Sequence, residues 1–120
     1  MDIVHEEERE TVRIAKELSK AVLESDEYRK YRECLEEIRK DSGLYDKVNH
    51  LRRSNFEMQN GEGGRLSYEE YSALAEESMT LRQSTVVSEF LDAEVGLGRL
   101  VQEIVNIVVG NIDFDNEFLN

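Results

Sequence analysis

The chain has 120 residues, of which 39% are hydrophobic, and its 27 acidic and 15 basic residues give a formal net charge of -12. That length matches one domain with one modest core. The negative charge opposes direct binding to DNA or to an anionic membrane surface. The single cysteine excludes an internal disulfide, and no run approaches the ~18 consecutive apolar residues of a membrane span. We therefore expect a cytoplasmic protein without a membrane segment, which influences nucleic acid, if at all, through another protein.

The first half of the chain carries apolar residues at three- and four-residue steps, and no proline interrupts them. This is the spacing of amphipathic helices. It predicts a first helix over about residues 4–23 and a second helix that Ser25 can cap. The sequence leaves open whether these two are separate or joined through a kink. A third helix is predicted to follow residues 41–43 and to end near Gln59.

The second half begins with a loop, because the three glycines within residues 60–65 carry too much backbone entropy for a helix interior. Ser67 and Glu70 have the spacing of a capping box and predict the start of a fourth, short helix. Ser84 can cap a long fifth helix. The sequence thus predicts an all-α fold, an antiparallel bundle of about four to five helices with a long C-terminal helix. We expect a single helical domain over residues 1–110 and an acidic tail over residues 111–120.

The long fifth helix is the element that we expect to join chains to one another, since a helix that is apolar on several sides is typical of a central or intersubunit position. The predicted interface residues are Phe90, Leu97, Val101, Ile104, Val105 and Val108. Gly96 and Gly98 lie in the same helix, where each costs about 1 kcal/mol relative to alanine. Close approach of another helix is the favoured explanation of these glycines, and a functional hinge is the alternative.

No set of residues in the sequence assembles into a catalytic or metal-binding constellation. We interpret His5 and His50 as surface residues. Cys34 lies near an apolar stripe, and we interpret it as a packed side chain rather than a reactive thiol or a cluster ligand. We therefore predict no cofactor and no enzymatic activity.

Two charged features are candidates for partner binding. A basic cluster on the third helix consists of Lys47, His50, Arg52 and Arg53. Ion pairs with glutamates of a neighbouring helix are the favoured interpretation of this cluster, and docking of an acidic partner or RNA is the alternative. In residues 112–119 acidic and apolar residues alternate, which indicates either a solvated tail or an acidic docking segment.

Three helical segments carry a family resemblance that covers nearly the whole chain, from the first helix to Val109. Residues 24–31, ESDEYRKY, have a serine-acid-tyrosine opening of a second helix, and residues 51–59, LRRSNFEMQ, form a third-helix segment. Residues 89–94, EFLDAE, are followed by Arg99 and Leu100 in the last helix. In this order and spacing the segments resemble the YlbF/YmcA family of small helical bacterial proteins.

The resemblance implies an all-α protein, commonly a dimer or higher oligomer, without enzymatic activity of its own. It also implies a regulatory role in complexes that modulate the RNA-processing endonuclease RNase Y. The chain departs from the family pattern where Asp41-Ser42 and Ser84-Thr85 replace helix starts that contain proline. Relatives proposed to hold iron-sulfur clusters have several cysteines, so Cys34 alone does not match that property.

We therefore expect a non-enzymatic regulatory adaptor that forms a homo-oligomer and binds protein partners, such as sibling family members and RNase Y. The alternative is a protein that binds a small ligand or RNA in an interhelical groove lined by Tyr28, Tyr31 and Arg52.

Overall fold

The computed structural model describes residues 9–60 and 67–119, and this part of the chain is built of helices without strands. The helices are α2 (Glu10–Leu23), α3 (Asp26–Arg39), α4 (Ser42–Asn60), α5 (Tyr68–Leu81) and α6 (Thr85–Gly110), and a short 3-10 turn, η1, spans Glu117–Leu119. The predictions of an all-α fold and of a long C-terminal helix are confirmed. Residues 4–8 of the first predicted helix, with His5, and the glycine loop lie outside the described residues.

The helix starts depend on side chains that accept hydrogen bonds from free backbone amides. Ser25 Oγ accepts from the backbone N–H of Tyr28 at 3.1 Å, and this cap makes α2 and α3 two separate helices. Ser67 and Glu70 form the predicted capping box at the start of α5. The Ser84 side chain likewise caps α6. These starts are therefore encoded locally, within three residues of each cap.

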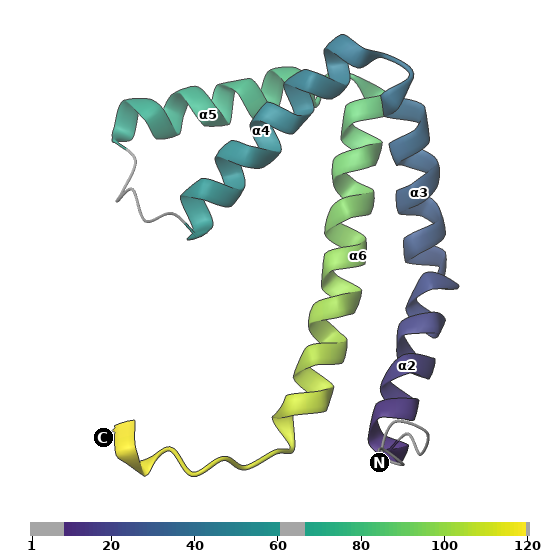
Figure 1. Ribbon diagram of the computed structural model, residues 1–120. Coiled ribbons are helices and arrows are strands. Elements are labelled where there is room, and N and C mark those ends of the chain that lie inside the picture. The colour runs from purple at the N-terminus through teal and green to yellow at the C-terminus, as the bar shows by residue number, and fades with distance from the viewer. Residues whose placement is uncertain (1–8, 61–66, 120) are drawn as a thin grey trace, which may run out of the picture.

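The helices are arranged as two pairs that diverge from a common end (Figure 1). Helices α3 and α6 lie side by side in opposite directions, and α4 and α5 form a second pair that projects to one side of α6. Helix α2 continues the line of α3 toward the C-terminal end of α6. The radius of gyration is 19.6 Å, whereas a compact chain of this length has a radius of about 14 Å. The chain on its own is therefore open and elongated.

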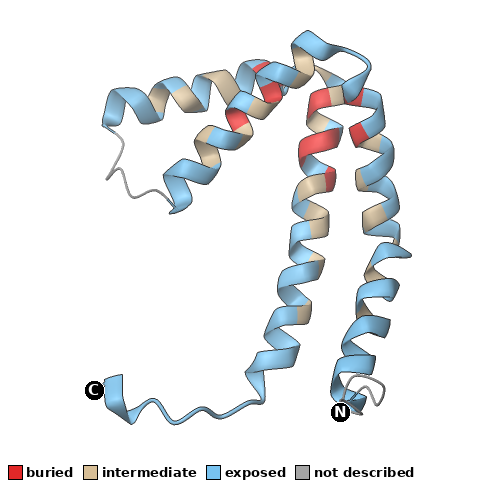
Figure 2. Ribbon diagram, in the orientation of Figure 1, coloured by how far each residue is buried: buried red, intermediate tan, exposed pale blue. Residues whose placement is uncertain are grey.

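The core lies where the two pairs meet. Its most enclosed side chains are Ile38 of α3, Val48 and Leu51 of α4, and Val87 and Phe90 of α6. Figure 2 shows that the buried positions gather at this end, whereas α2 and the C-terminal half of α6 are largely exposed. The accessible surface of 9895 Å² exceeds the about 6,700 Å² of a compact protein of this mass. The single chain therefore leaves more surface open to solvent than a compact protein of this mass does.

Candidate interaction surface

Apolar residues follow one side of α6 from inside the core to beyond it. On this side Val87 and Phe90 are buried. Val101 lies two heptads after Val87, and since two helical turns take about seven residues, both point to the same side of α6. The residues that continue this side beyond the core are Leu97, Val101, Ile104, Val105 and Val108, which we call the free α6 row.

Three members of the free α6 row, Val101, Val105 and Val108, are exposed because the helices that bury the start of α6 do not cover them. Val101 is 45% exposed, Val105 44% and Val108 51%, whereas Leu97 and Ile104 are partly buried. Contiguous exposed apolar surface of this kind marks protein-protein contacts in soluble proteins. The row therefore offers the surface that the sequence predicted for association, and the association itself stays a prediction.

Phe90 has a different place from the other predicted interface residues. Its side chain has no exposed surface, and its ring lies 5.7 Å from the ring of Tyr31, measured between centroids. The guanidinium of Arg52 also lies over the Phe90 ring, 5.0 Å from its centroid. Phe90 thus belongs to the core of a single chain, because α3 and α4 already cover it.

Gly96 and Gly98, in the middle of α6, lie beside open space in the described part of the chain. No atom lies within 4 Å of the position that a Cβ would take at Gly96 or Gly98. The close helix approach predicted for them is therefore not made by the described residues of a single chain. Gly98 lies one heptad before Val105 on the exposed side of α6, so a second helix can approach closely there.

The basic cluster of α4 divides into residues that contact a carboxylate within the described chain and residues that do not. Arg52 Nη2 lies 2.6 Å from Glu94 Oε2, which fits the interpretation as an ion pair with a neighbouring helix. His50 Nδ1 lies 3.2 Å from Glu77 Oε1 of α5, within hydrogen-bond distance. Lys47 and Arg53 are exposed, and neither forms an ion pair with the described residues. They are therefore the exposed members of the cluster whose charge has no partner within the described residues.

Arg52 joins three helices. Its Nε and Nη2 both donate to Glu94 Oε2 of α6, its Nη1 donates to Asn49, and its Nη2 lies 3.5 Å from the hydroxyl of Tyr31 on α3. Burial alone lowers the pKa of Arg52, but the hydrogen bonds and charge of Glu94 outweigh it, so its pKa is raised. The guanidinium stays charged and holds α4 against α6.

Replacement of Arg52 by alanine is expected to lower the free energy of unfolding by about 1–3 kcal/mol. The reason is that Glu94 loses its partner and Phe90 loses the side chain that covers its ring. Urea unfolding followed by circular dichroism measures the change. Arg53→Ala on the same helix is the matched control, and we expect it to shift stability by less than about 0.5 kcal/mol. Equal losses in the two variants contradict this assignment.

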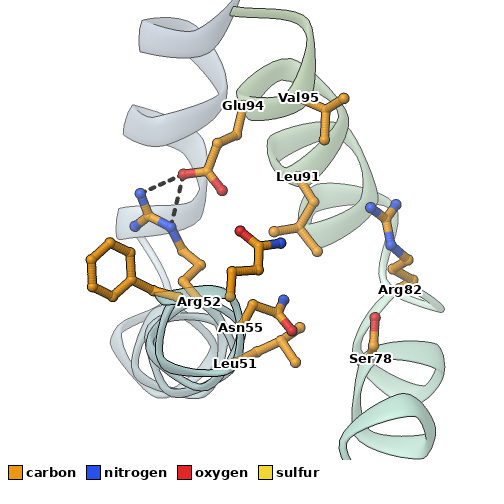
Figure 3. Close-up of a pocket in the computed structure, with 10 residues that line it drawn as sticks. Leu51, Arg52, Asn55, Ser78, Arg82, Leu91, Glu94 and Val95 are labelled. Atoms are coloured by element: carbon orange, nitrogen blue, oxygen red, sulfur yellow. Dashed lines mark hydrogen bonds and ion pairs between the residues drawn. The ribbon is translucent and has the colours of Figure 1, made fainter. Parts of the chain in front are cut away.

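A pocket of about 510 Å³ lies between α4, α5 and α6 (Figure 3). Arg52 of α4 reaches Glu94 on one side of the pocket, and Arg82 lies on the opposite side, where its Nη1 is 3.0 Å from Asp92 Oδ1. Leu91 and Val95 of α6 form part of the wall. The pocket thus has a partly apolar wall and an arginine-carboxylate pair on each side.

Sequence analysis did not predict this pocket. Arg82 comes close to α6 only because the chain turns between α5 and α6, and no local spacing signals it. Asn55 gave a weak signal, since it is a polar residue on the apolar stripe of α4, and in the structure it lines the pocket. The groove predicted from Tyr28, Tyr31 and Arg52 is a different arrangement. Tyr31 and Arg52 meet at Phe90, and neither tyrosine lines the pocket.

Cys34 is partly buried on α3, as predicted for a packed side chain. Burial, and after it the negative charge of Glu89, raises the pKa of the thiol. A raised pKa lowers the thiolate fraction at neutral pH, and the thiolate is the nucleophile. Within residues 9–60 and 67–119, no three His, Cys, Asp or Glu side chains gather in a way that suits a metal ion.

Alkylation of Cys34 by iodoacetamide at pH 7 is therefore expected to be slower than alkylation of glutathione, and to accelerate as the pH rises or when urea unfolds the chain. Mass spectrometry over time measures the modified fraction. A native rate equal to or above that of glutathione contradicts the account of this thiol.

The family profile described as "Control of competence regulator ComK, YlbF/YmcA" matches residues 12–113. The chain belongs to the YlbF/YmcA family. The match covers the free α6 row and the pocket, so both surfaces are parts of a YlbF/YmcA domain. It also confirms the family resemblance that the helical segments carry. This is a regulatory family rather than an enzyme family.

Two curated relatives are similar to this YlbF/YmcA-family chain over most of its length. A UPF0342 protein of Caldicellulosiruptor bescii is 26% identical over 106 residues, which cover 87% of this chain and 89% of the relative. A UPF0342 protein of Staphylococcus saprophyticus is 25% identical over 101 residues, which cover 82% of this chain and 89% of the relative. No solved structure matches the chain with significance. In the described part of this YlbF/YmcA-family chain, no helix is long and apolar enough to cross a membrane.

Proposed function

We propose that this protein is a non-enzymatic regulatory adaptor, which self-associates through the free α6 row and binds protein partners such as an RNase Y-associated complex. The observation that carries the proposal is the uncovered apolar side of α6, with Val101 and Val105 nearly half exposed. Exposure of such an apolar row to water is unfavourable, and contact with a second helix removes this cost because it buries the row.

Membership in a regulatory family supports a role in control rather than in turnover. The ground for proposing complexes with RNase Y and with sibling family members is the resemblance of this chain to the family. The net charge of -12 favours action through a protein, because a polyanion repels RNA.

The exposed basic residues of α4 are the surface that we assign to an acidic partner. Lys47, His50 and Arg53 lie at three-residue steps, which is the spacing of neighbours on one helix surface. His50 contacts Glu77, so Lys47 and Arg53 supply the accessible charge. Charges at the edge of an interface act mainly on the association rate and on its salt dependence.

The test is direct binding of purified RNase Y from the same bacterium, alone and with purified sibling family members, to the immobilised wild-type chain. We expect saturable binding that weakens at least tenfold in Lys47→Glu/Arg53→Glu, because both positions then repel an acidic surface.

The matched control is Lys20→Glu/Arg32→Glu, which makes the same change in charge on exposed positions of α2 and α3. It is expected to bind as wild type does. Absence of binding to RNase Y, to siblings and to their mixture contradicts the proposal, and so does tight binding of RNA alone.

A further inference from the structure

The segment after α6 is exposed although it is rich in aromatic side chains. Phe114 is 64% exposed and Phe118 80%, and they alternate with Asp113, Asp115 and Glu117. Within the described chain, no residue outside the segment hydrogen-bonds to its side chains; Asp115 accepts only from the backbone N–H of Glu117. Exposure of two phenylalanines is unfavourable in water, so residues 112–119 have the chemistry of a docking segment.

The pocket between α4, α5 and α6 has the complementary chemistry. Leu91 and Val95 supply apolar wall, and Phe56 is exposed at its edge. Arg52 and Arg82 lie on opposite sides, and each has a carboxylate partner, Glu94 for Arg52 and Asp92 for Arg82. Two arginines and one glutamate are the charged residues of the lining, in a chain of net charge -12. An acidic segment with aromatic residues therefore matches the apolar wall and the two arginines of this pocket.

Residues 112–119 of the same chain are too short to extend far into the pocket. Along α6, at about 1.5 Å per residue, Val95 lies about 24 Å from Asn111 and Leu91 about 30 Å. The eight residues from Asn111 to Leu119 span at most about 27 Å when fully extended. Even a straight chain folded back along α6 would bring only its last residue to the near edge of the pocket.

Residues 112–119 of a second copy of the chain can start closer to the pocket. The N-terminal half of the apolar side of α6 is already covered, because Val87 and Phe90 are buried, so only the free α6 row can overlap with a partner. Antiparallel overlap centred on Ile104 places Asn111 of the partner subunit opposite Leu97. The partner's next residues then run directly toward Val95 and the pocket.

We propose that the pocket between α4, α5 and α6 receives residues 112–119 of a second copy of this chain, with Phe114 against the apolar wall and the acidic side chains near Arg52 and Arg82. The exchange is reciprocal, so a dimer contains two such contacts. This inference rests on the self-association proposed above, and it specifies how the two chains are arranged in the dimer. It makes the C-terminal segment part of the dimer rather than a solvated tail.

Disulfide cross-linking in the full chain tests the contact. In a Cys34→Ser background, one chain carries Asp115→Cys and a second chain of different tag length carries Gln59→Cys at the rim of the pocket. We expect mild oxidation of the mixture to join the two chains efficiently. The matched control replaces Gln59→Cys by Glu36→Cys, on the exposed side of α3, and is expected to cross-link at least tenfold less.

Placing Asp115→Cys and Gln59→Cys on one chain separates the two sources of the segment. Covalent dimers support the proposal, whereas thiol loss at monomer mass shows that the segment binds its own pocket and overturns it. Light scattering on the same samples measures the mass, and so tests self-association separately from the contact between the segment and the pocket. A dimer without the cross-link overturns only the inference, and a monomer at all concentrations overturns the proposed self-association as well.

Discussion

Replacement of Val101 and Val105 by glutamate is expected to convert the associated protein into monomers without loss of helix content. Both side chains are nearly half exposed in a single chain, so the charges remain solvated in the monomer. In a dimer formed through the free α6 row, each chain would bury two uncompensated carboxylates. We expect the dissociation constant to rise at least about a hundredfold, equivalent to about 3 kcal/mol. Sedimentation equilibrium measures it.

The matched control is Gln102→Glu/Asn106→Glu, which adds the same charge on the same stretch of α6. These side chains are exposed and bond to each other across one turn at 2.9 Å, off the free α6 row. We expect this variant to keep the wild-type mass. Equal dissociation in both variants would show that net charge, rather than the row, decides association.

Truncation of Phe90 to alanine is expected to cause the largest loss of stability. Its ring is fully enclosed between Tyr31 of α3 and Arg52 of α4, so the change leaves a cavity at the point where the two helix pairs meet. Phe→Ala changes in cores cost about 3–5 kcal/mol, and for a domain of this size that lowers the melting temperature by about 10–20 °C. Thermal unfolding followed by circular dichroism measures the shift.

Tyr68→Ala is the control for this prediction, since its ring is 86% exposed at the start of α5. It is expected to change stability by less than about 0.5 kcal/mol. The milder Phe90→Leu variant keeps the test informative if alanine prevents folding, and we expect an intermediate melting temperature. A wild-type melting temperature for Phe90→Leu and Phe90→Ala contradicts the placement of the core.

The features that the sequence predicted correctly are those encoded within a few residues. Ser25, Ser67 and Ser84 act as caps through bonds to backbone amides in the next turn, so their spacing alone reveals the helix starts. The apolar side of α6 follows from helical periodicity in the same way. Periodicity does not tell how far neighbouring helices cover that side. The sequence therefore predicted Phe90 and Val101 alike as interface residues, although only Val101 is exposed in the single chain.

The pocket depends on contacts that have no local signature. Arg52 of α4 and Glu94 of α6 are 42 residues apart in the sequence, and Arg82 meets Asp92 only after the chain turns between α5 and α6. Their spacing in the sequence matches no helical repeat that periodicity analysis detects. Tertiary packing therefore places these charges, and the structure is needed to find them.

The central claim is that the open single chain is completed by a second copy at the free α6 row. The most direct measurement is the mass of the wild-type protein by light scattering after size-exclusion chromatography, over a range of loading concentrations. The account predicts twice the chain mass of 13.9 kDa. A constant mass of 13.9 kDa at every concentration would contradict it.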